Sequence, residues 1–157
     1  TVHLDWADAL LKANPDRRGS VVQHNILNTD NSWNSQTSFN ALKDNPNLLL
    51  MLCGHMHTPT DGAAYRAELG DDGHTIHIMM ADYQDYPNGG NGYMRILRFS
   101  PADDRIYATT YSNYLGASIS TSAFRVISVS INPKKLWLKR YPLKMIWTDK
   151  RATHFST

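Results

Sequence analysis

Two histidines stand directly after a continuous apolar run. The run "LLLMLC" covers residues 48–53, Gly54 follows it, and His55 and His57 come next with one residue between them. Imidazole is a common ligand for metals such as Zn, Fe and Mn. On a strand the two rings would point to opposite faces. Because they follow Gly54, which frees the chain to turn, we expect a turn that aims both rings into one crevice.

A third histidine has a similar setting. His24 ends the short β-branched stretch "SVVQH", residues 20–24. Ligands of open α/β sheets gather at the carboxyl ends of the strands. If the strands at 20–24 and 48–53 are neighbours, all three imidazoles meet at one sheet edge. The sequence therefore makes His24, His55 and His57 candidate metal ligands.

The elements that must position these histidines read as a mixture of helix and strand. Residues 5–13 predict a helix whose apolar face includes Trp6 and Leu10, and residues 35–45 predict a second helix. The run 48–53 lies between a proline and a glycine and does not alternate, which indicates a strand covered on both faces. The order helix, strand, helix, strand predicts an α/β layered fold.

The second half of the chain reads as antiparallel β structure, which makes the whole fold α/β (α+β): helix-strand units followed by β hairpins. Two turn signals, "GDDG" and "SPADD", each separate a pair of strand-like segments; the pairs cover 63–69 with 74–80 and 93–99 with 105–111.

A long glycine-rich loop joins the two predicted hairpins. It covers residues 81–93 and carries three glycines and a proline. Loops on a rigid scaffold often carry binding residues. Asp82, Tyr83 and Asn91 in this loop are therefore candidates for contacts with a substrate, although Asn and Asp also suit the turns themselves.

Composition limits the class of protein. The chain has 157 residues, of which 41% are hydrophobic, so it can bury a core of ordinary size. Its single cysteine, Cys53, rules out a disulfide framework and a cysteine-based zinc site. No apolar run approaches the roughly 18 residues of a membrane helix, so we expect no membrane span. The compartment stays open between export and the cytoplasm.

Charge divides the chain near residue 115. Residues 1–115 carry 8 Lys and Arg against 13 Asp and Glu, whereas residues 116–157 carry 8 against a single acid. We interpret 116–157 as a separate basic extension with possible strands at 124–131 and 135–141. A charge run is usually a solvated face, so this interpretation is favoured over nucleic-acid or anionic-membrane binding.

Several of these features occur together and in order in one family. "VVQH", the buried strand and "CGHMH" resemble the C-terminal half of the calcineurin-like metallophosphoesterases, and "ADYQDYPNGGNGYMRILRFSP" looks like a stretch of bacterial members. The resemblance covers about residues 3–115. It implies part of a four-layer sandwich that hydrolyses phosphomonoesters or phosphodiesters with two metal ions, such as Zn, Fe or Mn. It places His24 and His55 on one ion and His57 on the other.

No motif of the family's N-terminal half stands ahead of His24, where the family has them. These motifs are Asp-x-His, a Gly-Asp that supplies the bridging carboxylate, and Gly-Asn-His. The "GDDGH" turn, residues 70–74, contains a Gly-Asp and an Asp-x-His, but it lies on the wrong side of the histidines. The resemblance therefore implies a chain that needs the missing half of the domain as its partner and is inactive without it. Two alternatives stay open: a non-catalytic remnant that binds a metal or a partner, and a polyanion-binding protein acting through residues 116–157.

Overall fold

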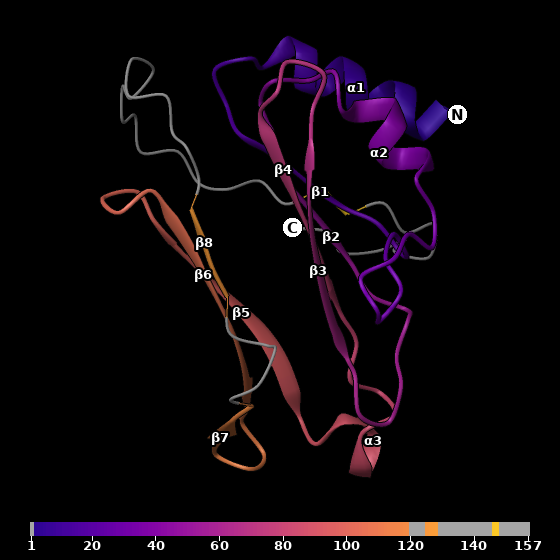
Figure 1. The fold of residues 1–157 in the computed structure, drawn as a ribbon, viewed down its shortest axis with the longest axis vertical. Helices are drawn as coiled ribbons and strands as arrows, with labels where there is room; N and C mark the ends of the chain where they lie inside the picture. Colours follow the sequence, from indigo (N-terminus) through magenta and orange to yellow (C-terminus); the bar gives the residue numbers. More distant parts are fainter. Residues whose placement is uncertain (1, 120–124, 129–145, 148–157) are drawn as a thin grey trace, which may run out of the picture.

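The computed structural model describes residues 2–119, 125–128 and 146–147. The fold is mixed, with two β-sheets and few helices, as expected for the α+β class (Figure 1). In chain order the elements are α1 (Val2–Ala13), β1 (Gly19–Val22), α2 (Thr37–Leu42), β2 (Leu48–Cys53), β3 (Ala63–Leu69), β4 (Thr75–Ala81), α3 (Pro87–Gly90), β5 (Tyr93–Ser100), β6 (Arg105–Ser112), β7 (Ala117–Ser118), β8 (Arg125–Ser128) and β9 (Ile146–Trp147).

Three parallel strands form the centre of the first sheet. The strand order is β3-β4-β2-β1-β9, and β2 pairs in parallel with β1 on one side and with β4 on the other. The predicted strand at 48–53 is confirmed, and so is its cover on both faces: Leu50 and Met51 are both fully buried and belong to different hydrophobic clusters. Because the three strands run in parallel, their carboxyl ends lie at the same edge of the sheet.

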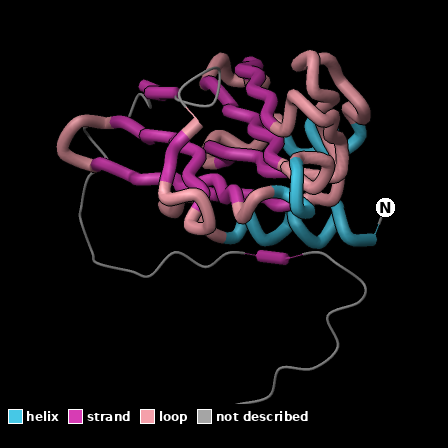
Figure 2. The backbone as a smooth tube through the Cα atoms, turned by 90° about the horizontal axis from the view of Figure 1, so that it is seen from below, coloured by secondary structure: helices cyan, strands magenta, loops and turns pink. Residues whose placement is uncertain are grey.

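Helices α1 and α2 cover one face of this sheet (Figure 2). The predicted apolar face of α1 was wrong: Leu11 is buried, Leu4 and Ala7 pack against the same cluster, and Trp6 is 50% exposed. The predicted stripe with Trp6 and Leu10 is apolar, and so is the stripe of Leu4, Ala7 and Leu11. Helical periodicity alone therefore cannot show which stripe is buried. The stripe with Leu11 is the buried one because this side of α1 packs closely against β1: a Cβ at Gly19 would fall 2.2 Å from Leu11 Cδ2.

The second sheet covers the opposite face. Its main part is the β5–β6 hairpin, paired from Tyr93 with Ser112 to Ser100 with Arg105. Ile106 and Ala108 of β6 pack with Leu50 and Met79 of the first sheet. Both predicted hairpins are confirmed, since β3 also pairs with β4 in antiparallel register. The described residues thus form a helical layer, a mixed sheet and an antiparallel sheet (Figure 1).

In the described part of the chain beyond residue 115 there are three short strands. Strands β7 and β8 pair with β6, and β9 pairs in parallel with β1. The strand predicted at 124–131 is present in part as β8, whereas the one predicted at 135–141 lies outside the described residues. Among the helices of the described part, none has both the length and the apolar character needed to cross a bilayer.

A buried histidine in the first sheet makes stability depend on pH. His77 of β4 is 4% exposed, and its Nδ1 lies 2.9 Å from the Tyr65 hydroxyl. Burial lowers the pKa of the His77 imidazole below its usual value. The unfolded chain takes up this proton near pH 6.5 and the folded chain resists it. The free energy of unfolding should therefore fall as the pH drops below about 6.5.

We expect His77→Phe to reduce this loss of stability between pH 7.5 and 5.5, because the folded state no longer excludes a proton at this position. Urea denaturation at the two pH values measures the effect, and His3→Gln, at an exposed position of α1, serves as the matched control. An equal loss of stability in the wild type and in His77→Phe would contradict the assignment.

Candidate functional site

Two of the three candidate ligands meet at the carboxyl edge of the first sheet. His24 follows β1 and His55 follows β2, and their ring centroids are 4.3 Å apart with an interplanar angle of 40°. Their backbones are joined as well, because the Gly54 N–H donates to the His24 carbonyl at 3.0 Å. Both side chains are exposed. The structure therefore brings together two of the residues that the sequence singled out, with both rings open to the surroundings.

The turn expected after the strand at 48–53 is present, and the residue with the unusual conformation in it is His55 and not Gly54. His55 has a φ of 69°. The Met56 N–H donates to the Gly54 carbonyl at 2.8 Å, which closes a γ-turn of the strained, positive-φ form around His55. A Cβ at Gly54 would lie 3.4 Å from the Ala81 carbonyl oxygen, which is an ordinary van der Waals contact, so crowding does not require a glycine there.

Asp82 holds this turn in place from the end of β4. Its Oδ2 accepts the His55 N–H at 3.0 Å and its Oδ1 accepts the Gln84 N–H at 3.1 Å. Its own N–H donates to the Gly62 carbonyl at 2.8 Å. Asp82 is one of the candidates for substrate contact, and in the structure both of its carboxylate oxygens accept backbone N–H groups. Its carboxylate thus stabilises the strained His55 conformation.

His57 lies against the glycine-rich loop. Its Nδ1 is 2.7 Å from Oδ2 of Asp85, and its Nε2 contacts the side-chain amide nitrogen of Gln84. The side chain is only 24% exposed. Sequence reasoning did not select Gln84 or Asp85 as site residues. The available signal was their position two and three residues after Asp82, in a loop that follows a strand end.

The other two candidates for substrate contact have structural roles. Tyr83 is 7% exposed, its hydroxyl lies 2.7 Å from that of Thr110, and Arg95 Nη2 donates to it at 3.1 Å. Tyr83 therefore attaches the loop after β4 to strands β5 and β6 of the second sheet. Asn91 has a φ of 47°, and its Oδ1 accepts the Asn88 amide at 3.0 Å, which is the turn chemistry that such a residue favours.

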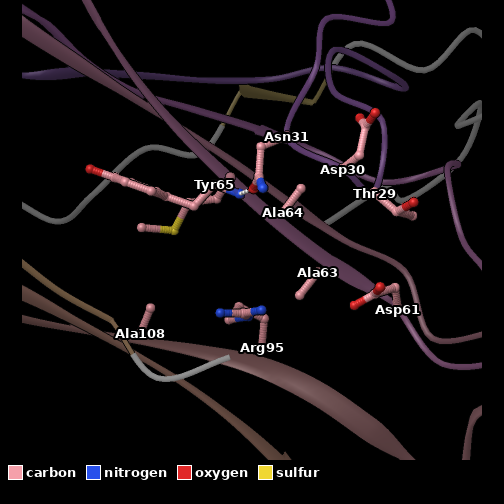
Figure 3. Close-up of a pocket in the computed structure, with 10 residues that line it drawn as sticks. Thr29, Asp30, Asn31, Asp61, Ala63, Ala64, Tyr65, Arg95 and Ala108 are labelled. Atoms are coloured by element: carbon pink, nitrogen blue, oxygen red, sulfur yellow. Dashed lines mark hydrogen bonds between the residues drawn. The ribbon is translucent and has the colours of Figure 1, made fainter. Parts of the chain in front are cut away.

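A pocket of about 240 Å³ lies between the two sheets, apart from the histidines (Figure 3). Arg95 of β5 projects into it, and alanines of β3 and β6 form part of its wall. The lining residues are Thr29, Asp30, Asn31, Asp61, Ala63, Ala64, Tyr65, Met79, Arg95 and Ala108. None of the three candidate metal ligands is among them.

The edge of the first sheet that carries His24 and His55, called here the histidine edge, has side chains that can bind a metal ion. Neutral imidazoles suit Zn, Fe and Mn, and the convergent pair of His24 and His55 offers two ligand nitrogens. Within residues 2–119, 125–128 and 146–147, no group of three or more His, Cys, Asp or Glu side chains is arranged to hold a metal ion. The described donors thus amount to two ligands that a metal ion could use, and a complete site would need further ligands.

The strained conformation of His55 should reverse the usual preference for Ala over Gly. We expect His55→Gly to be more stable than His55→Ala by roughly 1 kcal/mol, because a non-glycine residue at positive φ is strained by about 1–3 kcal/mol. Chemical denaturation measures the difference. The control is Ala9→Gly within α1, which should lower stability by about 0.5–1 kcal/mol. A His55→Ala variant that is the more stable of the pair would contradict the strain.

Comparison with known proteins gives one informative match. No family model matches the chain, and no solved structure matches it either. The chain is 37% identical over 121 residues to a Bacillus subtilis (strain 168) protein named "Uncharacterized protein YvnB". The match covers 70% of this chain and 9% of that protein, so the chain spans less than a tenth of the length of its relative.

Proposed function

We propose that this chain is the C-terminal part of a metal-dependent phosphoesterase domain, which hydrolyses phosphomonoesters or phosphodiesters at a dinuclear metal site. The observation that carries the proposal is the pairing of the His24 and His55 rings, 4.3 Å apart, where parallel strands end. The resemblance of "VVQH" and "CGHMH" to the calcineurin-like metallophosphoesterases points the same way.

Each histidine has a distinct role in this proposal. His24 and His55 together hold one ion, and His57 holds the second through its Nε2. Two such ions, when bound, would lower the pKa of a bound water and stabilise the charge on the transferring phosphoryl group. Asp82 contributes indirectly, because its bond to the His55 N–H keeps that ring at the edge.

The three described layers fit three of the layers of a four-layer sandwich. In that arrangement further helices would cover the outer face of the β5–β6 sheet. Met94 and Ile96 of β5 support this extension, because they are 48% and 43% exposed on a face that no described element covers. Exposed apolar side chains on one sheet face are typical of a surface that another part of a protein covers.

The carboxylate ligands would come from another part of a longer protein. No Asp-x-His, Gly-Asp or Gly-Asn-His motif precedes His24 in these 157 residues, and the Bacillus relative is many times longer than the stretch that matches. The partner of this chain is thus the N-terminal half of the same domain. The alternative is a module that binds a metal or a protein partner without catalysis.

Metal binding should depend on the histidine edge. We expect the wild-type chain to retain Zn²⁺ after dialysis and the double variant His55→Ala, His57→Ala to lose most of it, because two of the three imidazole ligands are removed. Metal per chain, measured by atomic emission, checks this. A His3→Ala variant controls for non-specific binding to an exposed histidine. Equal metal content in the wild type and the double variant would remove the proposed site.

Catalysis should require the missing half of the domain. We expect no metal-dependent hydrolysis of p-nitrophenyl phosphate or of bis-p-nitrophenyl phosphate by the 157-residue chain, because it lacks the bridging carboxylate. A longer protein that includes the N-terminal motifs should hydrolyse at least one of them and should lose that activity with His24→Ala. Robust turnover by the chain alone would contradict the proposal, and a longer protein that binds metal without turnover would favour the alternative.

A further inference from the structure

The loop after β4 is fastened to the histidine turn at several points. The Asp82 carboxylate accepts the His55 N–H at 3.0 Å, and the Tyr86 hydroxyl donates to the Thr60 carbonyl at 2.9 Å. Between these two attachments, His57 lies against Gln84 and Asp85. The two segments therefore run side by side, and the loop determines the surroundings of the His57 ring.

The two nitrogens of His57 face groups of opposite hydrogen-bonding character. Oδ2 of Asp85 lies 2.7 Å from Nδ1, and the amide nitrogen of Gln84 contacts Nε2. An ionised carboxylate only accepts hydrogen bonds, whereas an amide nitrogen only donates them. The neutral ring satisfies both neighbours when the proton is on Nδ1 and the lone pair is on Nε2.

The opposite tautomer would be in conflict with both neighbours. A proton on Nε2 would point at the amide hydrogens of Gln84, and the Nδ1 lone pair would face a carboxylate oxygen at 2.7 Å. Nδ1 is buried from water, and its N–H direction is not aligned with an acceptor. Because water does not reach Nδ1, the Asp85 carboxylate at 2.7 Å is the acceptor that stands within hydrogen-bond distance of it.

We propose that Asp85 is a positioning residue that holds His57 in the Nδ1–H tautomer, and that Gln84 covers the Nε2 lone pair until a ligand replaces it. The use of this arrangement rests on the proposed function, because a ligand imidazole commonly donates its other N–H to a carboxylate. Asp85 fixes which nitrogen is free to bind. Gln84, an exposed side chain at the start of the same loop, limits access to that nitrogen.

The tautomer can be measured directly by ¹⁵N NMR of the imidazole nitrogens in the full 157-residue chain. At pH about 8.5, where an unperturbed histidine is neutral, we expect His57 to show a protonated Nδ1 and an unprotonated Nε2. Asp85→Ala should shift the ring toward the Nε2–H form that free histidine favours in water. Asp85→Glu should restore the wild-type pattern, and Asp16→Asn, an exposed residue before the amino end of β1, should leave it unchanged.

A protonated Nε2 in the wild type, or an Asp85→Ala spectrum identical to that of the wild type, would overturn the proposal. If Asp85→Ala does not fold, the tautomer of His57 is measured in the wild type and in Asp85→Glu, and these two spectra test the proposal. A merely structural role for Asp85 would change stability without changing the tautomer.

A zinc titration followed by the same resonances separates this inference from the proposed function. Zn²⁺ should perturb the Nε2 resonance of His57 in the wild type. The Zn²⁺ concentration needed for this should be roughly 10–100-fold higher in Asp85→Ala than in the wild type. It should be lower in Gln84→Ala than in the wild type. If the tautomer is as proposed but Zn²⁺ never reaches Nε2, the metal-dependent function fails and the positioning by Asp85 stands. If Zn²⁺ binds equally well in the wild type, Asp85→Ala and Gln84→Ala, the roles of Asp85 and Gln84 fail and the metal site stands.

Discussion

The parallel pairing of β1, β2 and β4 is the constraint on which the candidate site depends. Because β2 pairs in parallel with both neighbours, the segments that follow all three strands emerge at one edge. His24, His55 and Asp82 are the residues that this topology gathers there. Hydrogen bonds from the Gly54 N–H to the His24 carbonyl and from the His55 N–H to Asp82 add to the sheet ladder there. The apolar clusters on the two faces of β2 keep that ladder in place.

The edge is held in a strained conformation that the loop after β4 supports. His55 has positive φ within a γ-turn, and such residues persist only where their surroundings fix them. The Asp82 carboxylate supplies part of that support through the His55 N–H. Farther along the loop, Gln84 and Asp85 contact both ring nitrogens of His57. One loop therefore controls the backbone of one candidate ligand and the side chain of another.

Much of the fold and part of the site could be predicted from the sequence. The continuous apolar run at 48–53 predicts a strand covered on both faces, and the two turn signals predict the hairpins, because these patterns depend on neighbouring residues. The buried face of α1 could not be predicted in this way, since two apolar stripes compete and packing on Gly19 decides. The roles of Tyr83, Gln84 and Asp85 depend on contacts across the fold, which local spacing does not reveal.

Anomalous X-ray diffraction from crystals of this chain grown with Zn²⁺ tests the central claim most directly. The account predicts a zinc peak about 2.0–2.1 Å from one nitrogen of His24 and one of His55, the usual Zn–N distance. A second peak, if the second ion is retained, should lie at Nε2 of His57. Zinc peaks only at other histidines, or no peak at the edge where β1 and β2 end, would contradict the account.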